Sequence, residues 1–212
     1  MLLRNLDTIA ERIRGNLEAK NAARDITLQR SRELIRQSAN AIRAAHRNEF
    51  AESAALLAAA HEIAAGMVAD LVDYPDLYHT GYTQDALKEY AEAHITVALV
   101  QGQDLPDPES LGVEYAAYLN GLGEAAGELR RYALDALRRG DITSAEAMLS
   151  RMDEIYDTLI TIDFPDAITG GLRRTADMVR GVLERTRGDL TVASRQQRLE
   201  EALKEFESRF GV

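Results

Sequence analysis

Four glutamates in two segments of the sequence have the spacing of a shared metal-binding or catalytic site. Glu89 and Glu92 are three residues apart, and Glu124 and Glu128 are four residues apart. On α-helices, these spacings place each pair on one face. If the two faces met, they would form a cup of four carboxylates, whose oxygen atoms suit Mg²⁺ or Mn²⁺. We therefore take these four residues as candidate metal ligands and catalytic residues.

The composition predicts one helical domain without cysteine chemistry. The 212 residues are 46% hydrophobic and 28% charged, with only 4 prolines, which suffices for a single packed domain over residues 1–212. The chain has 0 cysteines, which excludes disulfides, thiolate metal sites and a cysteine nucleophile. Charged residues interrupt the longest apolar-rich stretch, residues 54–72, so no membrane span is expected. The N-terminus has no apolar core of signal-peptide length, so we expect a cytoplasmic protein.

The net charge of −10 is unevenly distributed along the chain. Residues 1–48 hold ten Lys and Arg against five acids, whereas residues 62–125 hold twelve acids and one base, Lys88. A basic first helix beside an acidic centre suits a phosphate-bearing partner, because arginines can bind phosphates while metal ions bind the carboxylates.

The pattern of helix formers predicts an all-α bundle of about seven helices, because the β-branched runs typical of strands are missing. We expect a bend or break in the first helix near Asn21, an N-cap of the fifth helix at Asp141 and an N-cap of the last helix at Thr191. The expected helices cover about residues 6–47, 48–72, 83–101, 110–139, 141–163, 166–187 and 191–208.

Three glycines, Gly121, Gly123 and Gly127, interrupt the expected fourth helix. Each costs about 1 kcal/mol relative to alanine. Close approach of a neighbouring helix explains them best, and it would bring the two acidic faces together.

Several motifs resemble the translin family. Residues 118–131, followed by Gly-Asp at 140–141, are similar to the family's Tyr-Leu-x-Gly helix, its Gly-Glu-Leu element and its Gly-Asp helix boundary. Residues 89–93, Glu-Tyr-Ala-Glu-Ala, resemble the Glu-Tyr-Val-Glu-Ala of TRAX-like members. Residues 31–35, Ser-Arg-Glu-Leu-Ile, resemble their Ser-Arg-Asp-Ile-Thr segment. The resemblance covers about residues 25–189 and implies a translin-like fold.

The resemblance to TRAX-like members implies a metal-dependent endoribonuclease that cleaves single-stranded RNA by metal-activated water. Its catalytic acids correspond to Glu89, Glu92 and Glu124 here, and Glu128 is the next acid on the same helix face. The third acid is Asp in TRAX-like members and Glu in this chain. Because such hydrolysis does not use the ribose 2′-hydroxyl, single-stranded DNA is expected as a further substrate.

The resemblance also implies partners. Family members assemble as hollow octamers with the acids facing inward, so we expect a homo-oligomer. The basic first helix supplies the candidate RNA contacts, and Arg32 comes first among them because it lies in the Ser-Arg element. The predicted RNA-binding residues are Arg32, Arg36, Arg43 and Arg47.

Other interpretations stay open. The acids alone could form an ordinary solvated helix face, and the arginines could be ordinary surface charges. A translin-like module that binds RNA or single-stranded DNA without catalysis is the alternative function. The four histidines, His46, His61, His79 and His94, show no metal-ligand spacing, and the sequence contains no P-loop, zinc-protease or dinucleotide motif.

Overall fold

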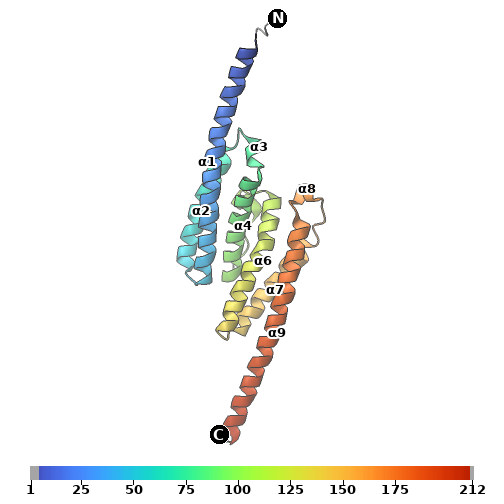
Figure 1. Cartoon of the computed structure of the whole chain (residues 1–212). Helices are drawn as coiled ribbons and strands as arrows, with labels where there is room; N and C mark the ends of the chain where they lie inside the picture. Colours follow the sequence, from blue (N-terminus) through green and yellow to red (C-terminus); the bar gives the residue numbers. More distant parts are fainter. Residues whose placement is uncertain (1–4, 211–212) are drawn as a thin grey trace.

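The protein is all-α, as predicted (Figure 1). The computed structural model describes residues 5–210, and residues 1–4 and 211–212 of the predicted domain lie outside the described residues. Within that range there are nine helices and no strand, and no helix is both long enough and apolar enough to cross a membrane. The helices are α1 (Leu6–His46), α2 (Phe50–Asp70), α3 (Pro75–Tyr78), α4 (Gly81–Gln101), α5 (Pro108–Leu111), α6 (Tyr115–Arg138), α7 (Ile142–Leu159), α8 (Asp166–Thr169) and α9 (Leu172–Phe210).

Helices α4 and α6 form the centre of the bundle. They pack on each other, α1 and α2 cover α4, and α7 and α9 cover α6 (Figure 1). The ends of α1 and α9 project from opposite ends of this body (Figure 1). Fully buried side chains from six helices fill the core, among them Leu34, Met67, Tyr90, Leu129, Met152 and Val179. The candidate site therefore lies on the most firmly packed pair of helices.

Two expected helix boundaries were wrong. Helix α1 runs unbroken through Asn21, whose side-chain amide donates a hydrogen bond to Asp25 Oδ2 at 3.3 Å, one turn further on. Helix α9 runs unbroken through residue 191. Thr191 does not cap it, because its hydroxyl donates to the carbonyl of Arg187, 2.8 Å away within the same helix. Neither position contains a proline or a left-handed residue, so nothing forces the helix to end there.

Glycines in the left-handed conformation set several helix boundaries that differ from the predicted ones. Gly112 (φ 65°) ends the short α5, so α6 begins at Tyr115 rather than near residue 110. Gly170 and Gly171 (φ 62° and 86°) separate α8 from α9 inside the segment expected to be one helix. The predicted cap of the fifth long helix is confirmed, because the Asp141 side chain accepts a hydrogen bond from the Ser144 amide at 3.0 Å.

Candidate metal centre

Helices α4 and α6 bring three of the four predicted acids together. Glu89 and Glu92 come from α4 and Glu124 comes from α6, and each offers an oxygen atom within 4.8 Å of the others. Glu92 is only 8% exposed, whereas Glu89 and Glu124 are half-buried. We call Glu89, Glu92 and Glu124 the acidic triad.

Gly121 permits this close approach. A Cβ atom at Gly121 would lie 2.8 Å from the Lys88 carbonyl oxygen and 3.0 Å from the Glu92 amide nitrogen, both in the α4 backbone. The predicted helix contact is therefore confirmed at Gly121. Gly123 has the same role toward α9, where a Cβ would collide with the Thr175 side chain, whereas nothing lies within 4 Å of a Cβ at Gly127. One glycine thus sets the distance between the two acidic faces.

Two acids of the triad hold their protons more tightly than usual. Burial, reinforced by the charges of Glu89 and Glu124, raises the pKa of Glu92 to about 8. Burial and the charge of Glu124 also raise the pKa of Glu89. A carboxyl group responds in this way when like charges surround it without enough counter-charge. The electrostatics therefore favour a proton or a metal cation at the triad.

Among the described residues, Lys88 supplies the one direct counter-charge to the triad. Its Nζ atom donates a hydrogen bond to Glu124 Oε1 at 2.7 Å, and the two side chains are 21% and 32% exposed. Burial lowers the pKa of Lys88 and the bond to Glu124 raises it, with a net upward shift. Lys88 was not among the predicted site residues, although its position beside Glu89, as the one base in residues 62–125, was the available signal.

Glu128 has a different partner from the triad. His46, at the end of α1, places Nε2 2.5 Å from Glu128 Oε2, and the His46 side chain is 5% exposed. This hydrogen bond lowers the pKa of Glu128 although burial acts in the opposite direction. The sequence offered no signal for this pair, because the two residues are 82 positions apart. Glu128 borders the triad, since its charge contributes to the raised pKa of Glu92.

A groove borders the acidic triad at Glu124. A cavity of about 760 Å³ lies between α4, α6 and the α8–α9 junction. Lys88 and Glu124 line it at the triad, and Arg174 of α9 lines it as a second cation. Among the described residues, Arg174 has no ion pair or side-chain hydrogen bond. The groove therefore gives a ligand access to the triad at Glu124. Its main polar lining residues are His79, Asp85, Lys88, Glu114, Asn120, Glu124 and Arg174.

The donor set fits a hard divalent cation. Mg²⁺ and Mn²⁺ prefer carboxylate oxygens, and octahedral coordination at about 2.1 Å places ligand oxygens roughly 3–4 Å apart. The triad oxygens lie within 4.8 Å of one another, which is at most roughly 1 Å beyond that range, and a glutamate side chain can close such a gap by a rotamer adjustment.

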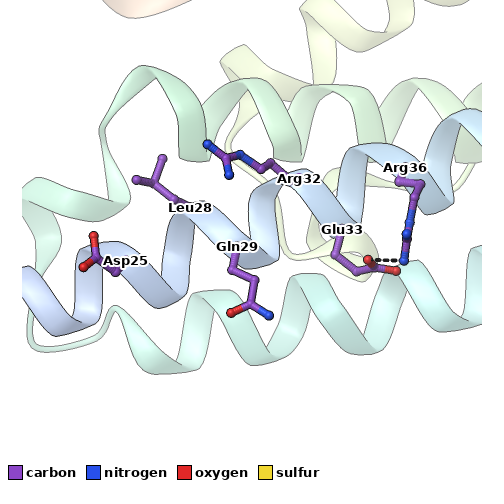
Figure 2. Close-up of a pocket in the computed structure, with 6 residues that line it drawn as sticks. All are labelled: Asp25, Leu28, Gln29, Arg32, Glu33 and Arg36. Atoms are coloured by element: carbon purple, nitrogen blue, oxygen red, sulfur yellow. Dashed lines mark hydrogen bonds and ion pairs between the residues drawn. The ribbon is translucent and has the colours of Figure 1, made fainter.

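The four predicted RNA-binding arginines differ in their surroundings. Arg36 pairs with Glu33, and Arg47 pairs with Glu49 and Glu52. Arg32 lines the same shallow pocket on α1 as Arg36, but its side chain points away from the Arg36–Glu33 pair (Figure 2). Within the described part of the chain, Arg32 makes no ion pair or side-chain hydrogen bond.

Arg43 is the predicted arginine whose charge acts on one of the four acids, Glu128. It donates a hydrogen bond to Asn40 Oδ1 at 2.6 Å, and its charge contributes to the lowered pKa of Glu128. The end of α1 therefore brings a cation to the edge of the site.

Known proteins share this architecture and part of the sequence. No family model matches the chain. An uncharacterized protein of Methanocaldococcus jannaschii is 28% identical over 195 residues, which cover 89% of this chain and 84% of that protein. AfC3PO, solved alone and in complex with duplex RNA, is 37% identical with a TM-score of 0.82, over 88% of this chain and 97% of AfC3PO. Apo-NeC3PO is 24% identical with a TM-score of 0.77, over 91% of this chain and 99% of NeC3PO, and supports the fold alone.

The fold is that of the C3PO structures. With 37% identity over nearly all of AfC3PO, the chain belongs to the translin/TRAX family. The predicted family and the translin-like fold are thereby confirmed.

Proposed function

We propose that this protein is a divalent-metal-dependent endoribonuclease whose ion-binding carboxylates are Glu89, Glu92 and Glu124. The observation that carries the proposal is the approach of their oxygen atoms to within 4.8 Å on the two central helices. A bound Mg²⁺ or Mn²⁺ would activate a water molecule and offset the charge on the leaving oxygen. The solved complex of AfC3PO with duplex RNA supports RNA as the class of substrate.

The residues of the chain have separate tasks in this reaction. The triad would hold the ion, and Glu92 would bind it as a carboxylate, because a ligating carboxyl group is deprotonated. The groove receives the RNA strand, with Arg174 positioned to bind a phosphate. A water oxygen attacks the phosphorus and the bond to the 3′ oxygen breaks, which leaves 5′-phosphate and 3′-hydroxyl ends. The 2′-hydroxyl takes no part, so single-stranded DNA is expected to be cut as well.

Cleavage assays test the proposal. Labelled single-stranded RNA, duplex RNA and single-stranded DNA are incubated with the protein and Mg²⁺ or Mn²⁺, with and without EDTA. Glu89→Gln and Glu124→Gln should each abolish cleavage, while the control Glu146→Gln, an exposed acid on α7, should not. Cleavage that persists in EDTA, or no cleavage with either ion, would overturn the proposal.

A non-catalytic RNA-binding module is the second candidate function. It is favoured by the side-chain contacts that two acids already have, Glu124 with the Lys88 ammonium group and Glu128 with the His46 ring. This alternative predicts that RNA is retained in a salt-dependent manner and that no products form with any divalent ion. The same incubations therefore separate the two functions.

We propose further that the protein works as a homo-oligomer, with the octamer implied by its family resemblance. The projecting part of α9 exposes Val192, Leu199 and Leu203 at 58%, 61% and 53%, and the projecting part of α1 exposes Ile13 and Leu17 at 52% and 57%. Apolar side chains in such rows favour contact with another chain. Light scattering should give a multiple of 23.4 kDa. A monomer would overturn this part of the proposal.

A further inference from the structure

Lys88 has an unusual place in the charge pattern of the protein. It is the one basic residue among twelve acids between positions 62 and 125, and it directly precedes Glu89. Its ammonium group reaches across from α4 to α6 and lies 2.7 Å from Glu124 Oε1. The two side chains are mostly buried, so this pair is less screened by solvent than an ordinary surface ion pair. Lys88 is therefore a fixed cation at the edge of the acidic triad.

Lys88 offsets the repulsion among the triad carboxylates in the absence of a metal ion. Asp85 and Glu89 flank it on α4, and their charges, like that of Glu124, favour the ammonium form. Gly121 packs directly over the Lys88 carbonyl, which fixes the backbone from which the side chain extends. Without this ammonium, the three triad carboxylates would face one another with no direct counter-ion among the described residues. Lys88 thus offsets a repulsion that the fold itself creates.

We propose that Lys88 is a built-in competitor of the divalent ion: it occupies Glu124 in the metal-free protein and must leave when the ion binds. This inference rests on the proposed metal site. A carboxylate oxygen shared with an ammonium group is a weaker metal ligand, and the ammonium charge repels a divalent cation at the distances involved. The ion therefore binds only by exchanging with Lys88.

The groove provides the place to which Lys88 moves. Lys88 already lines this cavity, and its flexible four-carbon stem allows the ammonium to turn away from Glu124 without a backbone change. In the groove it would join Arg174 as a second free cation. Binding of the ion would then expose a positive charge where the RNA phosphates are expected, so that Lys88 acts as a positioning residue that couples ion binding to RNA binding.

Paired measurements on Lys88→Met test the competition. The variant keeps most of the apolar stem and removes the charge. We expect the metal-free variant to melt at a lower temperature than the parent, and its Mn²⁺ dissociation constant, measured by calorimetry, to be about tenfold lower. Lys88→Arg, which keeps the charge, should stay close to the parent in both measurements. Lys20→Met is the matched control, because it removes an ion-paired lysine on α1, where Lys20 pairs with Asp76.

The outcomes separate this inference from the proposed function. Tighter Mn²⁺ binding together with a lower melting temperature supports the competition, since a merely structural lysine would not raise ion affinity when removed. Binding by the variant alone supports it equally. Equal or weaker binding by Lys88→Met, beside a parent that binds Mn²⁺, overturns the role of Lys88 and leaves the metal site standing. If neither protein binds Mn²⁺, both proposals fail.

Discussion

Glu92 on α4 and Glu128 on α6 belong to the same predicted cup of carboxylates, yet the fold shifts their pKa values in opposite directions. Burial among like charges raises the pKa of Glu92 to about 8, whereas the hydrogen bond from His46 lowers the pKa of Glu128. Both side chains are largely shielded from solvent, so burial alone does not decide the outcome. The difference lies in the partner that each carboxylate has.

This contrast divides the cup into two parts. Glu128 already has a hydrogen bond with His46. Glu92 has no ion pair among the described residues, so a bound cation would stabilise its carboxylate form. The ability of an acidic cluster to bind a metal ion thus depends more on which carboxylates have no charged or hydrogen-bonding partner than on the number of carboxylates. On that basis the proposed metal centre comprises three of the four predicted residues, with Glu128 beside it as a supporting group.

The largest expected effect concerns ion affinity. Glu92→Gln removes a ligand and should raise the Mn²⁺ dissociation constant at least about a hundredfold, whereas Glu128→Gln should raise it about tenfold or less, as for a group outside the ligand set. Calorimetric titration of both variants at one pH provides the comparison. Equal losses in the two variants would show that all four acids act as ligands.

The next effect is on stability as a function of pH, in metal-free protein. From about pH 4.5 upward the unfolded chain releases the Glu92 proton while the folded protein keeps it, so the free energy of unfolding should fall as the pH rises toward 8. Glu92→Gln lacks this penalty and should be more stable than the parent by roughly 2 kcal/mol near pH 8, with little difference near pH 5.

Glu128 provides the control of opposite sign. Because its pKa is lowered, its contribution is present above about pH 4.5 and is lost as the pH falls through the folded-state value. Glu128→Gln should therefore be less stable than the parent at neutral pH. Urea unfolding at pH 5, 6.5 and 8 measures all three proteins. A Glu92→Gln gain that stays constant across this range would contradict the assignment of the shift to Glu92.

A smaller effect is expected for the coupling energy between His46 and Glu128. A double-mutant cycle with His46→Leu and Glu128→Gln should give a coupling energy of about 1–1.5 kcal/mol at neutral pH, as for a partly buried hydrogen bond to a charged group. The same cycle with Glu92→Gln in place of Glu128→Gln should give much less. A coupling near zero for the first cycle would remove the physical basis of the contrast.

The sequence predicted what depends on local spacing. Glu89 and Glu92 follow from an i, i+3 pattern. The close approach of a neighbouring helix was predicted from three glycines, of which Gly121 alone makes the contact with α4. The continuity of α1 and α9 was missed because Asn21 and Thr191 permit a helix end but do not require one. A local pattern alone cannot decide such positions.

The pairing of Glu128 with His46 could not be predicted from the sequence, for a different reason. It depends on where the end of α1 lies against α6, a long-range contact between segments 82 residues apart. Helix periodicity identifies which face of each helix is polar, but it does not identify which polar groups of two distant helices meet. The partner of each carboxylate, which decides its chemistry, therefore required the three-dimensional structure.

The smallest expected effect extends the contrast from the acids to the cations. Arg36 is paired with Glu33, whereas Arg32, in the same pocket, has no ion pair among the described residues (Figure 2). A phosphate binds more readily to an arginine that need not first leave a carboxylate. Arg32→Gln should thus weaken RNA binding about threefold and reduce the slope of affinity against salt by up to about one unit, while Arg36→Gln changes both less. Titrations with single-stranded and duplex RNA at several salt concentrations measure this. If Arg36→Gln weakened RNA binding more than Arg32→Gln, the absence of an ion pair in the free protein would not predict which arginine contacts RNA.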